Sequence, residues 1–184
     1  VLLLGKQDAE TSVTPKIMSC HDPRSPQLGS HCLVEAIHLP AQMGEIDRWH
    51  ANRIAAGVPE GSVDLTPERA LMLEAGLDQL GAVDFEKGCY VGQEVTARTH
   101  YRGLVKRRLV PLTIAGDPPA INSDITWQSA VIGKSKTAAA LTVPIAGEHE
   151  PTDTKSICLA LLKLSDIHNI LDAPADGDGP TTNG

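Results

Sequence analysis

The chain has 184 residues, of which 41% are hydrophobic and only 3% aromatic, and its formal net charge is −7. This length and apolar content suffice for one domain or two small ones with a buried core, and no apolar run is long enough to cross a membrane as a helix. The acidic balance excludes non-specific binding of nucleic acid or anionic membranes by the whole surface. The four cysteines lack the short paired spacing of a disulfide framework, which indicates a reducing compartment.

The N-terminal part predicts short extended segments separated by polar loops. Residues 1–6 begin without a methionine or a basic segment, so we expect a strand at the start of a fragment of a longer protein. Residues 7–15 are polar and predict a loop, and residues 20–29 predict a turn-rich connection. Residues 32–39 alternate in part between apolar and polar side chains and predict a strand.

Two Cys-His pairs in this part are candidate metal ligands. They are Cys20-His21 and His31-Cys32. Adjacent ligands in such pairs converge poorly on one ion, and the sequence has no C-x-x-C motif. We therefore expect a loop that tolerates sequence changes here rather than a metal site.

The next segments predict two helices. Residues 44–56 carry apolar side chains at helical spacing, Trp49 among them, and are followed by a glycine and a proline that end the helix. A tryptophan at such a position is typical of core packing. Thr66-Pro67 is a helix-start signal, and residues 66–80 could continue as helix, although Gly76 weakens that interpretation.

The stretch 87–94 is the most distinctive of the chain, because it combines a thiol, two glycines, an amide and a carboxylate in eight residues. The apolar run 81–85 predicts a strand and residues 91–102 predict a helix, so Cys89 is expected at a strand-to-helix junction. Free N–H groups, the helix dipole and Lys87 would lower the pKa of the thiol there, and the thiolate is the reactive form. The alternative is a small buried cysteine in a glycine-rich turn.

Charged residues near this stretch offer two further candidate sites. Asp84 and Glu86 lie two apart in the expected strand and could serve acid–base chemistry, although a solvated edge is the more usual arrangement. A basic cluster follows, comprising Arg98, His100, Arg102, Lys106, Arg107 and Arg108. It would meet an anionic ligand tail or RNA phosphates, or it would form only a solvated helix face.

The C-terminal part predicts several short strands with turn signals between them. The strand candidates are residues 109–114, 125–132, 137–145 and 156–164. This spacing indicates a small β-barrel or sandwich. We therefore expect an α+β chain with one domain over residues 1–105, a small β-barrel domain over 106–171, and a disordered tail over 172–184.

Residues 73–94 resemble the signature region of the YgfZ family of folate-binding proteins, which are relatives of the glycine-cleavage T-protein, an aminomethyltransferase. The stretch 87–94 follows the family's Lys-Gly-Cys-Tyr-x-Gly-Gln-Glu motif, which T-proteins lack. Further matches are Asp22-Pro23-Arg24 with Leu28-Gly29, Arg53-Ile54 with Gly57-Val58-Pro59-Glu60, and Arg102-Gly103 with Arg107-Arg108-Leu109-Val110. The resemblance covers most of residues 20–115 and weakly the β-rich end. The family's N-terminal portion, which supplies one wall of the folate pocket, would precede Val1.

The resemblance implies a partial T-protein-like folate-binding domain followed by the barrel. It implies a tetrahydrofolate-dependent factor in the assembly or repair of iron–sulfur clusters, which affects tRNA modification indirectly through cluster enzymes. The implied partners are folate and iron–sulfur client or assembly proteins. The implied location is the cytoplasm of a bacterium or the mitochondrial matrix of a eukaryote.

The resemblance also assigns roles to residues. Cys89 is the catalytic thiolate, a nucleophile or a transient ligand to iron or a cluster, and its loop is formed by Lys87, Gly88, Tyr90, Gly92, Gln93 and Glu94. Trp49, Glu74 and Arg98 are assigned to tetrahydrofolate, and no residue is assigned to a resident metal. Two alternatives stay open. One is a tetrahydrofolate-dependent transferase of the T-protein type, for which Cys89 is unnecessary, and the other is a binding module that contacts RNA.

Overall fold

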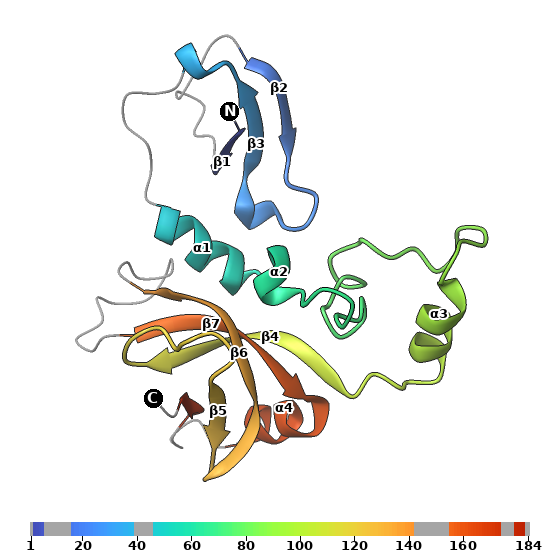
Figure 1. Cartoon of the computed structure of the whole chain (residues 1–184), viewed down its shortest axis with the longest axis vertical. Coiled ribbons are helices and arrows are strands. Elements are labelled where there is room, and N and C mark those ends of the chain that lie inside the picture. The colour runs from blue at the N-terminus through green and yellow to red at the C-terminus, as the bar shows by residue number, and fades with distance from the viewer. Residues whose placement is uncertain (1, 6–15, 39–45, 142–154, 174–178, 183–184) are drawn as a thin grey trace.

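The computed structural model describes residues 2–5, 16–38, 46–141, 155–173 and 179–182. They form a three-stranded and a five-stranded sheet, with helix α1 (Ile46–Ala55) lying between them (Figure 1). The mixed α and β class expected from the sequence is confirmed. None of the described helices is both long and apolar enough to cross a lipid bilayer.

The three-stranded sheet is antiparallel, with the order β1-β3-β2. Its strands are β1 (Leu2–Gly5), β2 (Lys16–His21) and β3 (Ser30–Val34). The predicted turn-rich connection therefore starts later than expected, because residues 20 and 21 still belong to β2. It contains the short helix η1 (Pro26–Leu28), and β3 ends early in a second short helix, η2 (Ala36–His38). The loop predicted at 7–15 lies outside the described residues.

The predicted helix around Trp49 is present as α1, and it packs against η1 on one side and against strands of the larger sheet on the other. Ile54 is fully buried on the side that faces the larger sheet. Gly57 follows the helix with φ of +69°, a conformation that L-residues with side chains rarely adopt. The short helix α2 (Gly61–Asp64) comes next.

The five-stranded sheet is antiparallel in the order β4-β7-β6-β5-β8. Its strands are β4 (Arg107–Ala115), β5 (Asp124–Trp127), β6 (Ala130–Ala140), β7 (Lys155–Lys163) and β8 (Thr181–Thr182). No hydrogen-bonded pairing joins the edge strands β4 and β8 in the described part of the chain, so a closed barrel is not confirmed.

Strand β7 is the centre of the core and is buried on both faces. Cys158, Ala160 and Leu162 belong to one cluster, which α4 (Leu164–Leu171) covers with partly buried isoleucines. Ile157 and Leu159 belong to the other cluster, which includes Ile54 of α1. Each fully buried aliphatic side chain of this kind contributes about 1.5–3 kcal/mol relative to exposure.

Three sequence predictions in this region are wrong. The strand predicted at 125–132 is a hairpin, because Gln128 and Ser129 both adopt positive φ and turn the chain between β5 and β6. The helix predicted at 66–80 is a series of turns, in which Gly76 has φ of +74°. The tail predicted as disordered from residue 172 is ordered at β8, which pairs with β5.

A buried ion pair between Arg53 and Asp64 joins α1 and α2 to the larger sheet. Asp64 Oδ2 accepts hydrogen bonds from Arg53 Nη1 (3.0 Å) and from the Glu60 N–H (2.8 Å). Asp64 Oδ1 accepts from the Thr137 N–H (2.8 Å) and hydroxyl (2.6 Å) in β6. The two side chains are only 1% and 0% exposed. Because burying two charges is costly, these hydrogen bonds are what makes the pair tolerable.

We expect Asp64→Ala to lower the free energy of unfolding by about 3–5 kcal/mol, because it removes the buried partner of the Arg53 guanidinium and leaves only the half-exposed carboxylate of Glu60 (3.2 Å). Denaturation in urea measures this change. The control is Asp124→Ala, which removes an exposed ion pair with Lys134 (2.6 Å) and should cost less than about 1 kcal/mol. Equal losses in the two variants would contradict a structural role for the buried pair.

Candidate functional site

The helix predicted after Cys89 is present as α3 (Gln93–Tyr101). Gly92 precedes it with φ of 87°, and Gly103 follows it with φ of 60°. The predicted strand before Cys89 is absent from residues 81–91, so the strand-to-helix junction is wrong. The physical reason is the side chain of Asp84, which accepts hydrogen bonds from the N–H groups of Glu86 (2.8 Å) and Lys87 (3.1 Å) and bends the chain into a turn.

The same contacts correct the carboxylate-pair hypothesis. Asp84 and Glu86 do not lie on one side of a strand, since their segment is not extended. The carboxylate of Asp84 is engaged by the backbone of its own turn. It therefore shapes the loop that leads to Cys89.

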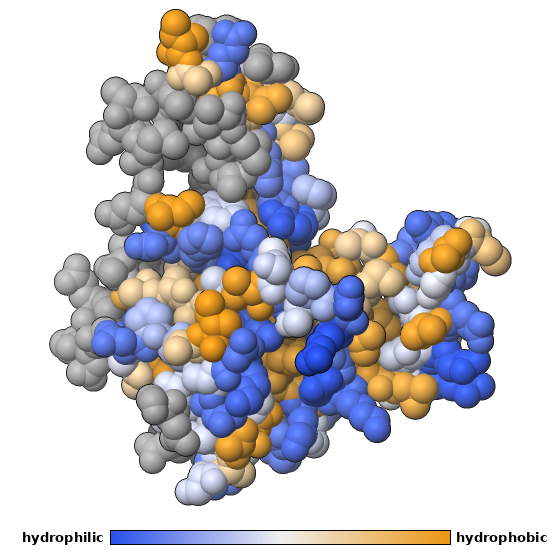
Figure 2. All heavy atoms as spheres, in the orientation of Figure 1, coloured by the Kyte–Doolittle hydropathy of each residue, from blue (hydrophilic) through white to orange (hydrophobic). Residues whose placement is uncertain are grey.

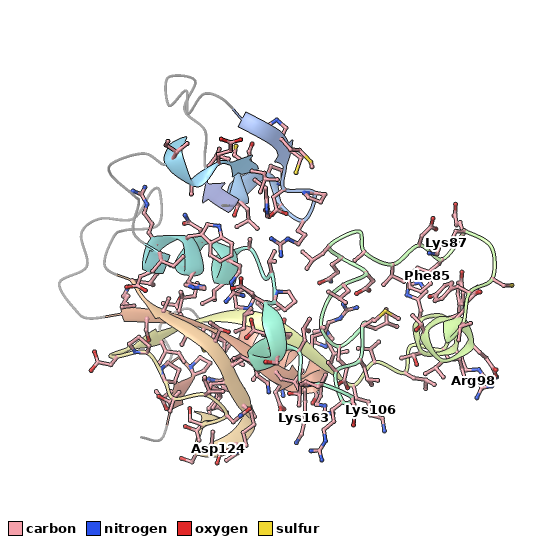
Figure 3. The ribbon with its side chains drawn as sticks, turned by 45° about the horizontal axis from the view of Figure 1, so that its top comes forward. Phe85, Lys87, Arg98, Lys106, Asp124 and Lys163 are labelled. Atoms are coloured by element: carbon pink, nitrogen blue, oxygen red, sulfur yellow. The ribbon has the colours of Figure 1, made fainter. Side chains whose placement is uncertain are left out.

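The loop before Cys89 folds back onto α3 and is held there by side chains. The ring of Phe85 stacks on His100 with centroids 3.9 Å apart and meets Tyr101 edge-on at 6.1 Å. The Tyr90 N–H donates to Gln93 Oε1 (3.1 Å), and Lys87 Nζ lies 4.9 Å from the centroid of the Tyr90 ring. We call residues 82–104 the Cys89 unit. Phe85 and Lys87 lie on one side of α3, and Arg98 extends from the other (Figure 3).

Cys89 lies at the edge of an open groove of about 570 Å³, which we call the Cys89 groove. Its lining residues are Cys89, Tyr90, Gln93, Glu94, Ala97, Arg98, Tyr101 and Arg102. Cys89 itself is exposed, so it is not the buried turn cysteine of the alternative interpretation. The motif residues after it line the groove or form the start of α3.

The three residues assigned to tetrahydrofolate do not converge. Trp49 is on α1, where its ring meets His50 edge-on at 5.2 Å and lies 6.0 Å from the Arg53 guanidinium. Glu74 is in the turns before α3 and accepts a hydrogen bond from Arg107 (3.3 Å). Arg98 is on α3, which stands apart from α1 in the fold (Figure 1).

The basic cluster is partly neutralised by this chain's own carboxylates. Arg108 donates to both oxygens of Asp78 (2.7 and 3.0 Å), Arg107 pairs with Glu74, and Arg98 pairs with Glu94 (2.6 Å). Burial acts to raise the pKa of the Asp78 carboxyl, but the adjacent Arg108 guanidinium outweighs it and holds the pKa below its usual value. Among the described residues, the side chains of Arg102 and Lys106 have no acidic partner.

The candidate metal ligands of the first sheet fall on two different faces. In the β2–β3 pairing, Cys20 is opposite His31, whereas the neighbouring His21 is opposite Ser30. Because successive residues of a strand point to opposite faces, Cys20 and His31 share one face while His21 and Cys32 share the other. In the part of the chain that the structure describes, no group of three or more such side chains could hold a metal ion.

Sequence reasoning missed an ionic cluster at the end of this hairpin. Asp22 accepts hydrogen bonds from Arg24 Nε (3.0 Å) and Nη2 (2.7 Å), and its Oδ2 lies 2.7 Å from His31 Nε2. The Arg24 hydrogen bonds hold the pKa of the Asp22 carboxyl far below its ordinary value. The only sequence signal for this cluster was the Asp-Pro-Arg turn. That signal does not reveal that His31 of β3 also contacts Asp22.

The four thiols should separate into two accessible and two protected groups. Cys20 and Cys89 are exposed, whereas Cys32 and Cys158 are buried, and burial raises the pKa of the Cys158 thiol to about 12. We expect the native protein to react rapidly with Ellman's reagent at two thiols and the unfolded protein at all four. In native Cys89→Ser or Cys20→Ser the rapid count should fall to one. An unchanged count in Cys89→Ser would show that this thiol is not accessible.

Comparison with known proteins gives no matching family model. Similar curated proteins include "Iron-sulfur cluster assembly factor IBA57, mitochondrial" of Mus musculus, which is 40% identical over 115 residues, 60% of this chain and 32% of that protein. The protein of the same name from Homo sapiens is 39% identical over 118 residues, 62% of this chain and 33% of that protein. The homolog from Mycosarcoma maydis is 45% identical over 105 residues, 53% of this chain and 26% of that protein. The chain thus matches about a third or less of the length of these relatives.

Proposed function

We propose that this protein acts in the assembly of iron–sulfur clusters, with the Cys89 thiolate as a transient ligand to iron or to a cluster. The observation that carries the proposal is the identity of about 40% to relatives named iron–sulfur cluster assembly factors. This is the functional class that the YgfZ resemblance implies. The exposed position of Cys89 supports the role, because cysteine thiolates are the ordinary protein ligands of iron–sulfur clusters.

The surroundings of Cys89 favour transient binding of a cluster over permanent binding. A typical cluster is held by four cysteine thiolates, or by histidines in place of two of them. Among the described residues no second Cys or His lines the Cys89 groove. The remaining ligands would have to come from another molecule. One exposed thiolate at the edge of an open groove suits a step in which a cluster is received or passed on.

The rest of the Cys89 unit positions this thiol. Gln93 fixes the backbone at Tyr90, next to Cys89, through its side-chain oxygen. The Phe85–His100 stack anchors the other end of the loop to α3. These local contacts hold Cys89 beside the groove while leaving the sulfur accessible to a partner.

Tetrahydrofolate binding is a separate proposal, and it rests on Trp49 and the family resemblance alone. Trp49, Glu74 and Arg98 lie on separate elements of the described structure and do not form one folate site there. We therefore derive no chemical step through folate. Trp49 is half-buried, and an indole ring of this kind can stack on a pterin or aminobenzoyl ring. Effects on tRNA modification would follow only from the iron–sulfur role.

The two alternative functions gain no specific support. Aminomethyl transfer would not need Cys89, and the described residues offer no converged folate site for it. Direct RNA binding would draw on the basic cluster, but three of its arginines are paired with carboxylates. The relatives are named as mitochondrial proteins, and we propose the mitochondrial matrix as the location for a eukaryotic source.

Replacing the thiol tests the iron–sulfur proposal. Anaerobic incubation of the protein with ferric iron, sulfide and an excess of glutathione, whose thiol supplies the ligands that the groove lacks, should produce the visible absorption of a thiolate-bound cluster. Cys89→Ser should lower the bound iron at least about tenfold. Cys20→Ser is the matched control, because Cys20 is also exposed, and it should retain the bound iron. Loss in both variants, or in neither, would contradict a specific role for Cys89. Circular dichroism confirms that each variant is folded.

Tryptophan fluorescence tests the folate proposal. The chain has two tryptophans, so Trp127→Phe isolates the emission of Trp49. We expect tetrahydrofolate to quench that emission in a saturable manner, because a stacked pterin contacts the indole directly. The control is Trp49→Phe, which leaves only Trp127 and corrects for light absorption by the ligand. If quenching in the two variants is the same, tetrahydrofolate does not bind at Trp49.

A further inference from the structure

We propose that the Cys89 groove is a docking surface for an acidic segment of a partner protein that also carries apolar side chains. This inference rests on the proposed function, since it names the kind of partner that would meet the thiol. The surface is the groove together with the exposed side chains at its border. It presents three features that a partner segment could contact: an uncovered helix face, unpaired positive charge and exposed apolar side chains.

The groove is the face of α3 that this chain leaves uncovered. One side of the helix is occupied by the stack of Phe85 on His100. A second side, with Thr96 and Thr99, faces a small hollow of about 50 Å³ shared with residues 71–74. The third side carries Glu94, Ala97, Arg98 and Tyr101, and it opens into the Cys89 groove. Tyr101 is 71% exposed there.

The charge of this surface is opposite to that of the rest of the molecule. The groove lining contains Arg98, Arg102 and Glu94, a formal charge of +1 in a chain of −7, and Lys106 follows α3. Glu94 is already paired with Arg98, and Arg102 and Lys106 have no acidic partner among the described residues. Lys163 is opposite Arg107 in the β4–β7 pairing and lies outside the lining of the groove (Figure 3). An acidic partner would be attracted to the positive charges of Arg102 and Lys106.

Apolar side chains border the same surface and select a protein partner over RNA. Val91, two residues after Cys89, is 103% exposed, and Val95 on α3, which is 66% exposed, lines the neighbouring hollow. The Cys89 unit shows hydrophobic and hydrophilic residues side by side in the space-filling view (Figure 2). RNA phosphates are bound by positive charge and hydrogen bonds and gain nothing from valine. A polypeptide with alternating acidic and apolar side chains would use both kinds of contact.

Selection from a random peptide library on the immobilised chain tests the docking surface. We expect the enriched peptides to combine Asp or Glu with apolar residues. A synthetic peptide of the enriched sequence should bind the double variant Arg102→Glu with Lys106→Glu at least about tenfold more weakly, measured by fluorescence anisotropy. It should bind Val91→Ser about fivefold more weakly, through lost apolar contact. The matched control is Arg48→Glu with Lys155→Glu, which reverses two exposed charges outside the Cys89 unit and should leave binding unchanged.

The results of these binding experiments support or overturn the proposed docking surface. Enrichment without acidic residues, or equal binding to the two double variants, would overturn it. Preferential binding of poly(U) RNA with steep salt dependence and no effect of Val91→Ser would replace the protein partner by RNA. Cys89→Ser separates the two proposals, since it should keep peptide binding while losing bound iron. Retained iron capture together with failed peptide binding would therefore refute only the docking surface.

Discussion

The ion pair between Arg53 and Asp64 is the contact on which the placement of the other elements depends. It is formed by α1 and α2, and it reaches β6 through both the N–H and the hydroxyl of Thr137. On its opposite side, helix α1 packs against η1, which lies in the connection between β2 and β3 of the smaller sheet (Figure 1). Because the pair is buried, it has few alternative geometries, and it sets a single orientation that apolar packing of Ile54 alone would not specify.

The Cys89 unit is stabilised in a different way. Of the residues of α3, only Thr96 is buried, and the helix stands apart from both sheets. Its order comes from short-range contacts, namely the Asp84 turn, the Gln93 contact to Tyr90 and the stacking of Phe85. Regions with few buried apolar contacts open at low free energy, and binding loops are often drawn from them. The thiol therefore lies in a loop just before a largely exposed helix.

The sequence predicted elements where one local pattern dominates. The apolar run of β7, the spacing in α1 and the glycines around α3 all led to elements that are present. It failed where backbone conformation overrides composition, as at Gly76, or at Gln128 and Ser129, whose positive φ splits an apolar run into a hairpin. The sequence also did not indicate whether Trp49, Glu74 and Arg98 lie together. Whether three distant residues meet is decided by tertiary packing, and no local pattern contains that information.

A single accessible thiol has a consequence for how the site would work. Iron in a cluster needs several ligands at once, and the Cys89 groove offers one sulfur among aromatic and charged side chains. A site with one ligand binds weakly by itself and gains affinity only when a second molecule supplies the others. If Cys89 ligates iron as proposed, the positive charge beside it would bring that molecule to the thiol before any bond to iron forms. In the two proposals, recognition by the surface and ligation by the sulfur are therefore separable properties of one short unit.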